Sequence, residues 1–119
     1  MTPETWAKAR PLIEAAIGRG LPTHTSDDIR EAIERGDMQM WCRGESVIVT
    51  EIRQFPRLKV CAAVLAGGRM ADCLELTPII EKWAAEHGCD YAEVYGRRGW
   101  QRVHKDYRLG AVVLRRALK

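Results

Sequence analysis

An apolar strand, a tight glycine turn, a helix and a second strand follow one another in the middle of the chain. The first strand is predicted over residues 58–65, the turn is Gly67-Gly68-Arg69, the helix ends at Gly88, and the second strand covers residues 91–95. Such a unit brings the backbone N–H groups at the start of its helix to the end of a strand, where proteins bind the phosphates of nucleotide-like ligands. This arrangement constrains the fold more than any other feature of the sequence.

Two helices and two strands are predicted before this unit, and a helix and a strand after it. Pro11 falls inside the first helix and predicts a break or kink near Arg10. Pro78 leaves two alternatives for the central helix: one long kinked helix, or a shorter helix capped by Thr77 with Pro78 at its first position. These further helices are predicted over residues 3–17, 26–35 and 97–107, and the further strands over 38–42, 46–54 and 111–114.

The predicted elements occur in the order α-α-β-β-β-α-β-α-β. Three consecutive strands form an antiparallel meander, and a crossover helix and strand follow them, which predicts an α/β fold with a mixed sheet. At 119 residues the chain is expected to form one domain over residues 1–119.

The net charge of +3 is distributed unevenly along the chain. Residues 1–90 carry 11 Lys or Arg against 14 Asp or Glu, a net charge of −3, whereas residues 91–119 carry 8 against 2, a net charge of +6. This asymmetry predicts a basic surface that meets phosphates or an acidic partner. Nucleic acid is disfavoured as that partner, because neither a helix-turn-helix pattern nor alternating aromatic and basic residues occur.

Neither a membrane span nor a signal peptide is predicted. No apolar run approaches the roughly 20 residues that a bilayer requires, and residues 1–6 have no basic and apolar regions of a signal peptide. The cytoplasm is therefore the expected location. The four cysteines form no C-x-x-C pair and have no histidine at ligand spacing, so we expect buried reduced thiols rather than a metal site.

The order of elements resembles that of the GNAT acyltransferase superfamily, from its first helix onward. In that family the central strand is followed by Gln/Arg-x-x-Gly-x-Gly/Ala, whose amide groups bind the pyrophosphate of acyl-coenzyme A. Here Ala66 stands in place of the Gln or Arg, Arg69 in place of the middle glycine, and Asp72 adds a negative charge. The resemblance thus implies a degenerate acyl-CoA site. The residues it assigns to acetyl-CoA are Gly67, Gly68, Arg69 and Met70.

Four short motifs lie outside the glycine turn. They are Asp28-Ile29-Arg30-Glu31-Ala32-Ile33 followed by Gly36-Asp37-Met38-Gln39, Val49-Thr50-Glu51-Ile52, Trp83-Ala84 with Gly88-Cys89, and Gly96-Arg97-Arg98-Gly99-Trp100. They resemble the small GNAT-like proteins of tailed bacteriophages and prophages. That resemblance implies a protein that acts by binding in a phage particle or its assembly, with other phage structural proteins or itself as partner. The alternative is an acetyl-CoA-dependent N-acetyltransferase that transfers an acetyl group to an amine.

Glu51 and Tyr107 are the candidate catalytic residues. Glu51 lies in mid-strand among apolar neighbours, where a GNAT general base would have its pKa raised by desolvation; the alternative is a carboxylate that faces solvent or pairs with Arg53 or Arg97. Tyr107 precedes Leu109-Gly110 much as the family's general-acid tyrosine precedes a glycine; the alternative is a ring that anchors a helix end.

A basic cluster follows the last strand of the central unit. Arg97, Arg98 and Arg102 surround Trp100 between two glycines. Guanidinium groups bind phosphate and carboxylate with matching planar geometry, which predicts contact with phosphates or an acidic partner surface. The alternative is a basic helix face in solvent.

Overall fold

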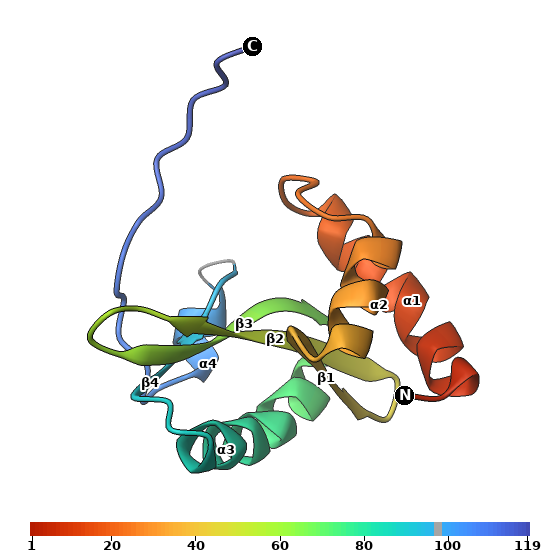
Figure 1. The fold of residues 1–119 in the computed structure, drawn as a ribbon, viewed down its shortest axis with the longest axis horizontal. Coiled ribbons are helices and arrows are strands. Elements are labelled where there is room, and N and C mark those ends of the chain that lie inside the picture. The colour runs from red at the N-terminus through yellow and green to blue at the C-terminus, as the bar shows by residue number, and fades with distance from the viewer. Residues whose placement is uncertain (97–98) are drawn as a thin grey trace.

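The computed structural model describes residues 1–96 and 99–119, which fold into a four-stranded sheet with helices on both faces (Figure 1). The fold class predicted from the sequence, a mixed α/β sheet, is confirmed. The helices are α1 (Pro3–Gly18), α2 (Ser26–Arg35), α3 (Met70–Glu86) and α4 (Gly99–Val103). The strands are β1 (Met38–Arg43), β2 (Ser46–Gln54), β3 (Lys59–Gly67) and β4 (Tyr91–Val94).

Side-chain caps fix the starts of the first two helices. Thr2 accepts a hydrogen bond from the N–H of Thr5, with Pro3 in the first turn of α1. Thr25 and Asp28 form a reciprocal capping box at the start of α2, because each side chain accepts from the other residue's N–H. These caps explain why both helices begin where the sequence predicts.

Two prolines lie inside helices without dividing them. Helix α1 is continuous through Pro11, and α3 is continuous through Pro78. The hydroxyl of Thr77 donates to the carbonyl oxygen of Cys73 one turn earlier, at 3.0 Å, so Thr77 does not cap a new helix. Of the two alternatives for the central helix, the single long helix is therefore the one formed.

The sheet has the order β1-β2-β3-β4. Strand β2 pairs antiparallel with β1 and β3, whereas β4 pairs parallel with β3. The parallel pairing covers only four positions and ends at Ala63 with Val94, yet β3 continues beside β2 as far as Gly67. A register shift at Val49/Thr50 accompanies this change. Strand β3 thus leaves β4 halfway along its length.

Each face of the sheet has its own apolar cluster. Helices α1 and α2 cover one face, and α3 covers the other. The alternation of side chains along each strand sends neighbouring residues to opposite clusters. The first cluster comprises Trp6, Ala9, Ile13, Ile29, Ala32, Met38, Val47 and Val49. The second comprises Ile48, Cys61, Cys73, Leu76, Ile80 and Ala84, with Trp100 of α4 packed against it.

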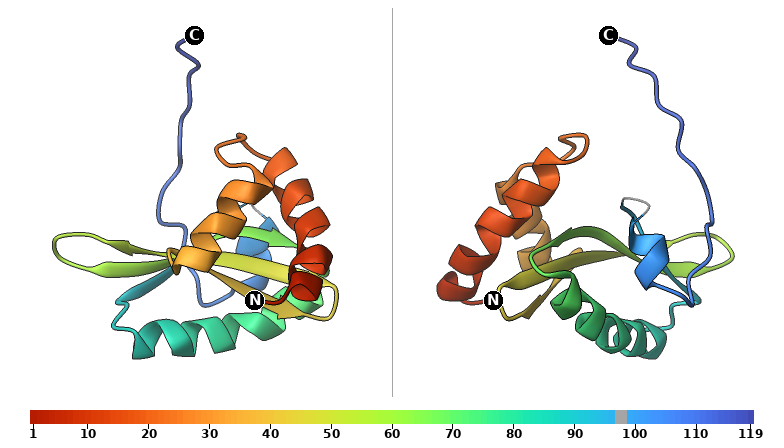
Figure 2. Two further views of the ribbon diagram at one scale, coloured as in Figure 1. Left: turned by 45° about the vertical axis from the view of Figure 1, so that its right-hand side comes forward. Right: turned by 180° about the vertical axis from the view of Figure 1, so that it is seen from behind.

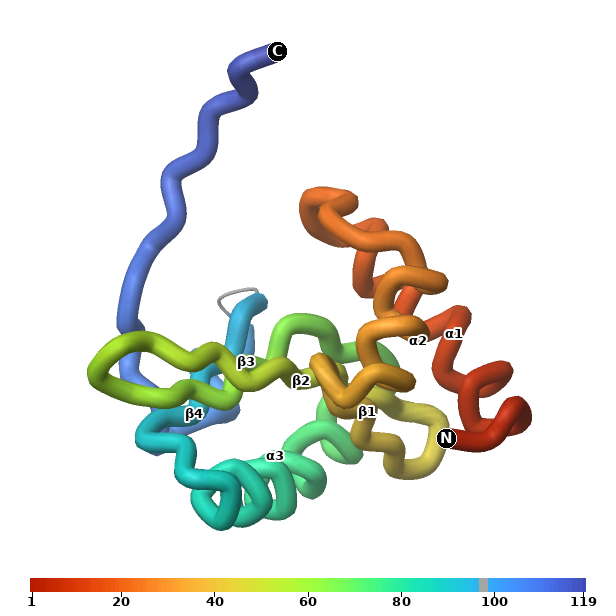
Figure 3. The backbone as a smooth tube through the Cα atoms, in the orientation of Figure 1, coloured from red at the N-terminus to blue at the C-terminus, as the bar shows by residue number. Residues whose placement is uncertain are grey.

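The strand expected over residues 111–114 is not formed. Residues 108–119, called the C-terminal segment below, lie in neither helix nor strand and extend away from the body (Figure 3). Their large apolar side chains are mostly exposed, and a strand forms only with a partner for its N–H and C=O groups. The helix expected over residues 97–107 is formed only as α4 over Gly99–Val103: residues 104–107 are turn and loop, so the expected C-terminal part of this helix is wrong, and residues 97 and 98 lie outside the described residues.

The four cysteines are free thiols in different surroundings. Cys61 and Cys73 are buried as expected, Cys89 is half-buried, and Cys42 is exposed. Within the two described ranges, no three His, Cys, Asp or Glu side chains are grouped to hold a metal ion. No helix of that same part of the chain is long and apolar enough to cross a membrane.

Gly68 offers a test of the connection between β3 and α3. Its φ is +103°, and an added Cβ would lie 2.5 Å from Ser46 Oγ and 2.7 Å from the Glu45 carbonyl oxygen. We expect Gly68→Ala to lower the free energy of unfolding by about 2 kcal/mol in urea denaturation, because the backbone is strained and the packing crowded. Gly18→Ala is the control, because a Cβ there meets nothing within 4 Å. Equal stability of the two variants would contradict this account of the turn.

Candidate functional site

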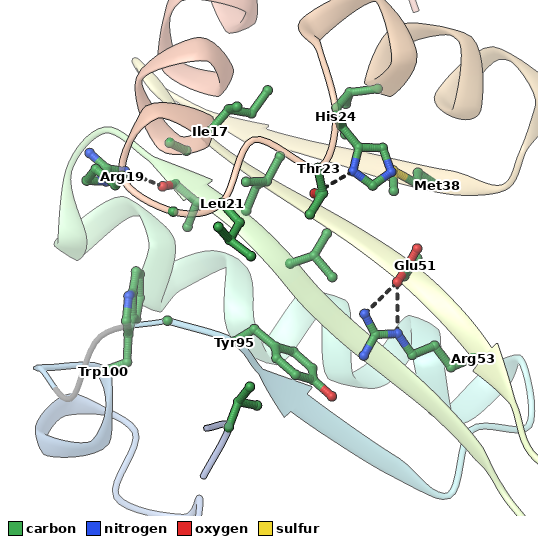
Figure 4. A pocket seen from close by; sticks show the side chains of 18 of the residues that line it. Ile17, Arg19, Leu21, Thr23, His24, Met38, Glu51, Arg53, Tyr95 and Trp100 are labelled. Carbon is green, nitrogen blue, oxygen red and sulfur yellow. Dashed lines mark hydrogen bonds and ion pairs between the residues drawn. The ribbon is translucent and has the colours of Figure 1, made fainter. Parts of the chain in front are cut away.

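The separation of β3 from β4 opens a cleft of about 630 Å³ (Figure 4). Residues 64–66 of β3 form one side, and Tyr95 and Gly96 after β4 form another. The cleft is completed by Glu51 and Arg53 of β2 and by the connection between α1 and α2. The remaining lining residues include Trp100 of α4 and Val113 and Arg115 of the C-terminal segment.

Glu51 lies in this cleft and is paired with Arg53. Arg53 donates from Nε at 2.8 Å and lies with Nη2 at 2.7 Å, and both contacts are to Oε1 of Glu51. The guanidinium carbon also lies 4.7 Å from the ring centre of Tyr95, a cation–π distance. The structure therefore forms the Arg53 pair that the sequence left as an alternative, and it does so inside the cleft.

Tyr107 is not brought into the cleft with Glu51. Its hydroxyl donates to Oε2 of Glu81 on α3 at 2.8 Å, in agreement with the alternative of a ring that anchors a helix end. Burial raises the pKa of Tyr107 above its ordinary value of 10.0, and the hydrogen bond to Glu81 and its charge raise this pKa further.

The ring of Tyr107 belongs to an aromatic stack behind the cleft. His104 is 7% exposed and lies between Trp100, with ring centres 5.5 Å apart, and Tyr107, with ring centres 5.1 Å apart. Desolvation lowers the pKa of His104, an effect that the charge of Glu81 partly offsets. The stack fixes Trp100, whose other side lines the cleft.

A second cavity of about 320 Å³ lies at the turn between β3 and α3. It is lined by three of the four residues that the sequence assigned to acetyl-CoA: Gly67, Gly68 and Met70. Arg69, the fourth, is the N-cap residue of α3, and its N–H donates to Ser46 Oγ at 2.8 Å. Arg69 is not among the residues that line the cavity.

The two glycines of this turn are explained by packing inside the protein. A Cβ on Gly67 would lie 2.8 Å from the carbonyl oxygen of Leu12 in α1, and a Cβ on Gly68 would overlap the connection between β1 and β2. Asp72 is turned toward that same connection, because its carboxylate accepts the Ser46 hydroxyl at 2.8 Å. The acid that the sequence placed beside a phosphate site therefore faces away from the second cavity.

The second cavity lies at the amino end of α3, and Met70, the first residue of this helix, is part of its lining. The first N–H groups of α3 have no partners within the helix, and no side chain caps them. The positive end of the helix dipole and the guanidinium of Arg19 add positive potential, and no acidic residue lines the cavity in the part of the chain described. The residues present thus fit the pyrophosphate of an acyl-CoA.

Arg19 was not predicted from the sequence. It follows the last turn of α1, and its Nη2 donates to the carbonyl oxygen of Ala66 at 2.9 Å, which brings its charge to the end of β3. Tyr95 was also not predicted as a site residue. Its place directly after a strand that runs parallel to β3 could have indicated that it lines the opening between the two strands. Of the predicted basic cluster, Arg102 is exposed on α4 and lines none of the cavities described here, and Arg97 and Arg98 lie outside the described residues.

The raised pKa of Tyr107 makes a prediction about alkaline stability. The folded protein holds the phenol proton more tightly than the unfolded chain does. The contribution of this proton to the free energy of unfolding is therefore complete below about pH 10 and is lost as the pH rises further. We expect Tyr107→Phe to lose about 1 kcal/mol near pH 8, from the missing hydrogen bond, and to show a weaker alkaline decline in melting temperature than the wild type. Tyr91→Phe is the control, because that side chain is exposed. An identical alkaline decline in wild type and Tyr107→Phe would refute this interpretation.

No protein-family model matches the sequence, and no curated protein matches it. Solved structures do match over nearly the whole chain. The structure of a probable acetyltransferase has a TM-score of 0.70 and 10% sequence identity, over 100% of this chain and 94% of the other. The aminoglycoside acetyltransferase meta-AAC0020 from an uncultured soil metagenomic sample, in complex with sisomicin, has a TM-score of 0.70 and 10% identity, over 98% and 90%.

A transcriptional regulator from Bacillus halodurans C-125 is similar to the same extent. Its TM-score is 0.71 at 11% identity, over 99% of this chain and 96% of the other. At such low identity the likeness concerns the fold, because unrelated activities share folds. The helices, the mixed sheet and the opening between its two parallel strands give this chain the fold of the GNAT acetyltransferases.

Proposed function

We propose that the protein is an acetyl-CoA-dependent N-acetyltransferase that transfers an acetyl group to an amine. The observation that carries the proposal is the junction of two cavities. The cavity at the start of α3 and the cleft between β3 and β4 share Arg19, Ala66 and Trp100 in their walls. One ligand can therefore have its phosphates at the helix and its reactive end beside Glu51.

The chain's own residues have distinct tasks in this proposal. The first amide groups of α3 and the guanidinium of Arg19 bind phosphate oxygens. Acetyl-CoA, when bound, supplies the acetyl group as a thioester. Both contacts from Arg53 are to Oε1 of Glu51, so Oε2 is the atom that would take the proton of the amine. As the amine nitrogen bonds to the acetyl carbon, the C–S bond of the thioester would break, and coenzyme A would leave as a thiolate that gains a proton from solvent. Arg53, held by Tyr95, is the positioning residue for Glu51.

A cationic amine is the acceptor that the charges favour. The cleft adjoins a third cavity of about 380 Å³, and the two share His24, Met38 and Glu51. Four carboxylates and one guanidinium line the third cavity: Asp28, Glu31, Asp37 and Glu51, with Arg35. This excess of negative charge attracts an ammonium group toward Glu51. The aminoglycoside acetyltransferase of the same fold, which is in complex with sisomicin, supports this class of acceptor.

A role in a phage particle stays a prediction that rests on the sequence resemblance alone. The sequence also predicted a degenerate acyl-CoA site, on the basis of Ala66, Arg69 and Asp72. The geometry favours binding over loss of binding, because Asp72 is engaged by Ser46 and Arg19 brings a guanidinium to the end of β3.

Binding of acetyl-CoA is the first test. We expect calorimetric titration to give a dissociation constant below about 100 μM, or about 5.5 kcal/mol of binding free energy. Met70→Glu should weaken binding at least about tenfold, because a carboxylate at this exposed first position of α3 repels phosphate while suiting the helix dipole. Met70→Gln is the matched control, with the same shape and no charge. No detectable binding, or equal binding by both variants, would overturn the assignment.

Loss of the Glu51 carboxylate tests the acceptor site. Acetyl transfer is measured as thiol release with a panel of diamines and aminoglycosides. With the best of these amines, Glu51→Gln is expected to lower kcat/KM by about 100-fold or more, the usual contribution of a general base, with little change in acetyl-CoA affinity. Glu34→Gln is the control, because Glu34 pairs with Arg30 on the surface of α2 and lines none of the three cavities. Equal activity of the two variants would remove Glu51 from the mechanism.

A further inference from the structure

The C-terminal segment has the sequence pattern of a strand but pairs with no strand in the described residues. Residues 111–114 are apolar and rich in valine, a pattern that predicts a strand. In the part of the chain that the structure describes, no backbone hydrogen bond joins this segment to the sheet. Its five large apolar side chains are 66–92% exposed: Leu109, Val112, Val113, Leu114 and Leu118. Such a segment lacks a partner strand.

The sheet has a matching edge. Strand β4 pairs with β3 on one side and, among the described residues, with no strand on the other. Tyr91, the first residue of β4, has 62% of its surface exposed. Unpaired N–H and C=O groups at a sheet edge are a template for a further strand, and natural proteins cover such edges.

The chain's own C-terminal segment is not seated on this edge. It passes the cleft, where Val113 and Arg115 form part of the lining, and then leaves the body of the molecule (Figures 1 and 2). Since it projects beyond its own domain, it is in a position to reach the edge of a neighbouring molecule.

Charge also favours a second copy as the partner. The C-terminal segment carries four basic and no acidic residues, whereas residues 1–90 have a net charge of −3. Strand β4 itself presents the exposed carboxylate of Glu93. The basic segment of one copy is thus attracted to the acidic body of another and repelled by a second basic segment.

We propose that residues 109–114 of one copy add a strand to the β4 edge of a second copy, and that the exchange is mutual. The result is a two-fold dimer in which both edges are covered and both apolar segments are buried. Val113 and Arg115 also line the cleft, but the dimer needs neither acetyl-CoA nor an amine, so the mass of the protein tests it separately from the proposed activity.

Proline substitution in the full-length chain tests the exchange. Neighbouring amides of a strand point to opposite sides, so one of the variants Val112→Pro and Val113→Pro removes an N–H that faces β4. Ala117→Pro is the matched control, in the same segment but outside the predicted strand. Sedimentation equilibrium of the wild type is expected to give twice the monomer mass of 13.5 kDa. At least one strand variant should fall to the monomer mass, and Ala117→Pro should keep the dimer.

Amide hydrogen exchange distinguishes a dimer with exchanged strands from a segment that pairs within its own chain. In the dimer, residues 110–114 and β4 are expected to be protected, and their protection should decrease on dilution. A wild type that stays monomeric at hundreds of micromolar overturns the proposal, and so does a dimer that both strand variants keep. Protection of residues 110–114 in a monomer also overturns it, because the segment then pairs within its own chain.

Discussion

The early end of the pairing between β3 and β4 is the constraint on which the rest of this structure depends. Four parallel pairs join the two strands up to Ala63 and Val94, after which β3 remains with β2 alone. The divergence leaves the part of β3 after Ala63 unpaired on the β4 side, so strand residues form one wall of the cleft. It also carries the start of α3 away from β4, which opens the second cavity beside the first.

Electrostatics divides the two connected cavities into regions of opposite sign. Arg19 and the amino end of α3 make the cavity at the turn positive, whereas the carboxylates of α2 and β2 make the far end of the cleft negative. In the proposed reaction, a ligand with phosphates and an amine substrate would occupy separate parts of this continuous site. The Glu51–Arg53 pair lies in the cleft next to the negative region, and in the proposed reaction its fixed geometry would hold the amine.

The sequence predicted the helices and strands through β4 well, because periodicity, caps and turns are local properties. The strand over residues 46–54 and the helix over 26–35 agree with the structure to the residue. The C-terminal strand failed because a strand depends on a partner that local pattern does not supply. Of the candidate site, the sequence named the glycine turn, which lines the second cavity, and Glu51, which lines the cleft and pairs with Arg53 as one of the alternatives stated. The position of Arg19 was not predicted, because it depends on a contact between segments distant in sequence.

The packing of the glycine turn has a consequence for how such chains are compared. Gly67 is required by α1 and Gly68 by the connection between β1 and β2, whether or not a coenzyme ever binds. Selection for folding alone would keep both glycines in a descendant that had lost catalysis. Glycines in this loop are therefore evidence of the fold and not of coenzyme binding. Relatives that bind and relatives that do not would instead differ in the charged residues around the loop, above all at Asp72, which is turned toward Ser46 here.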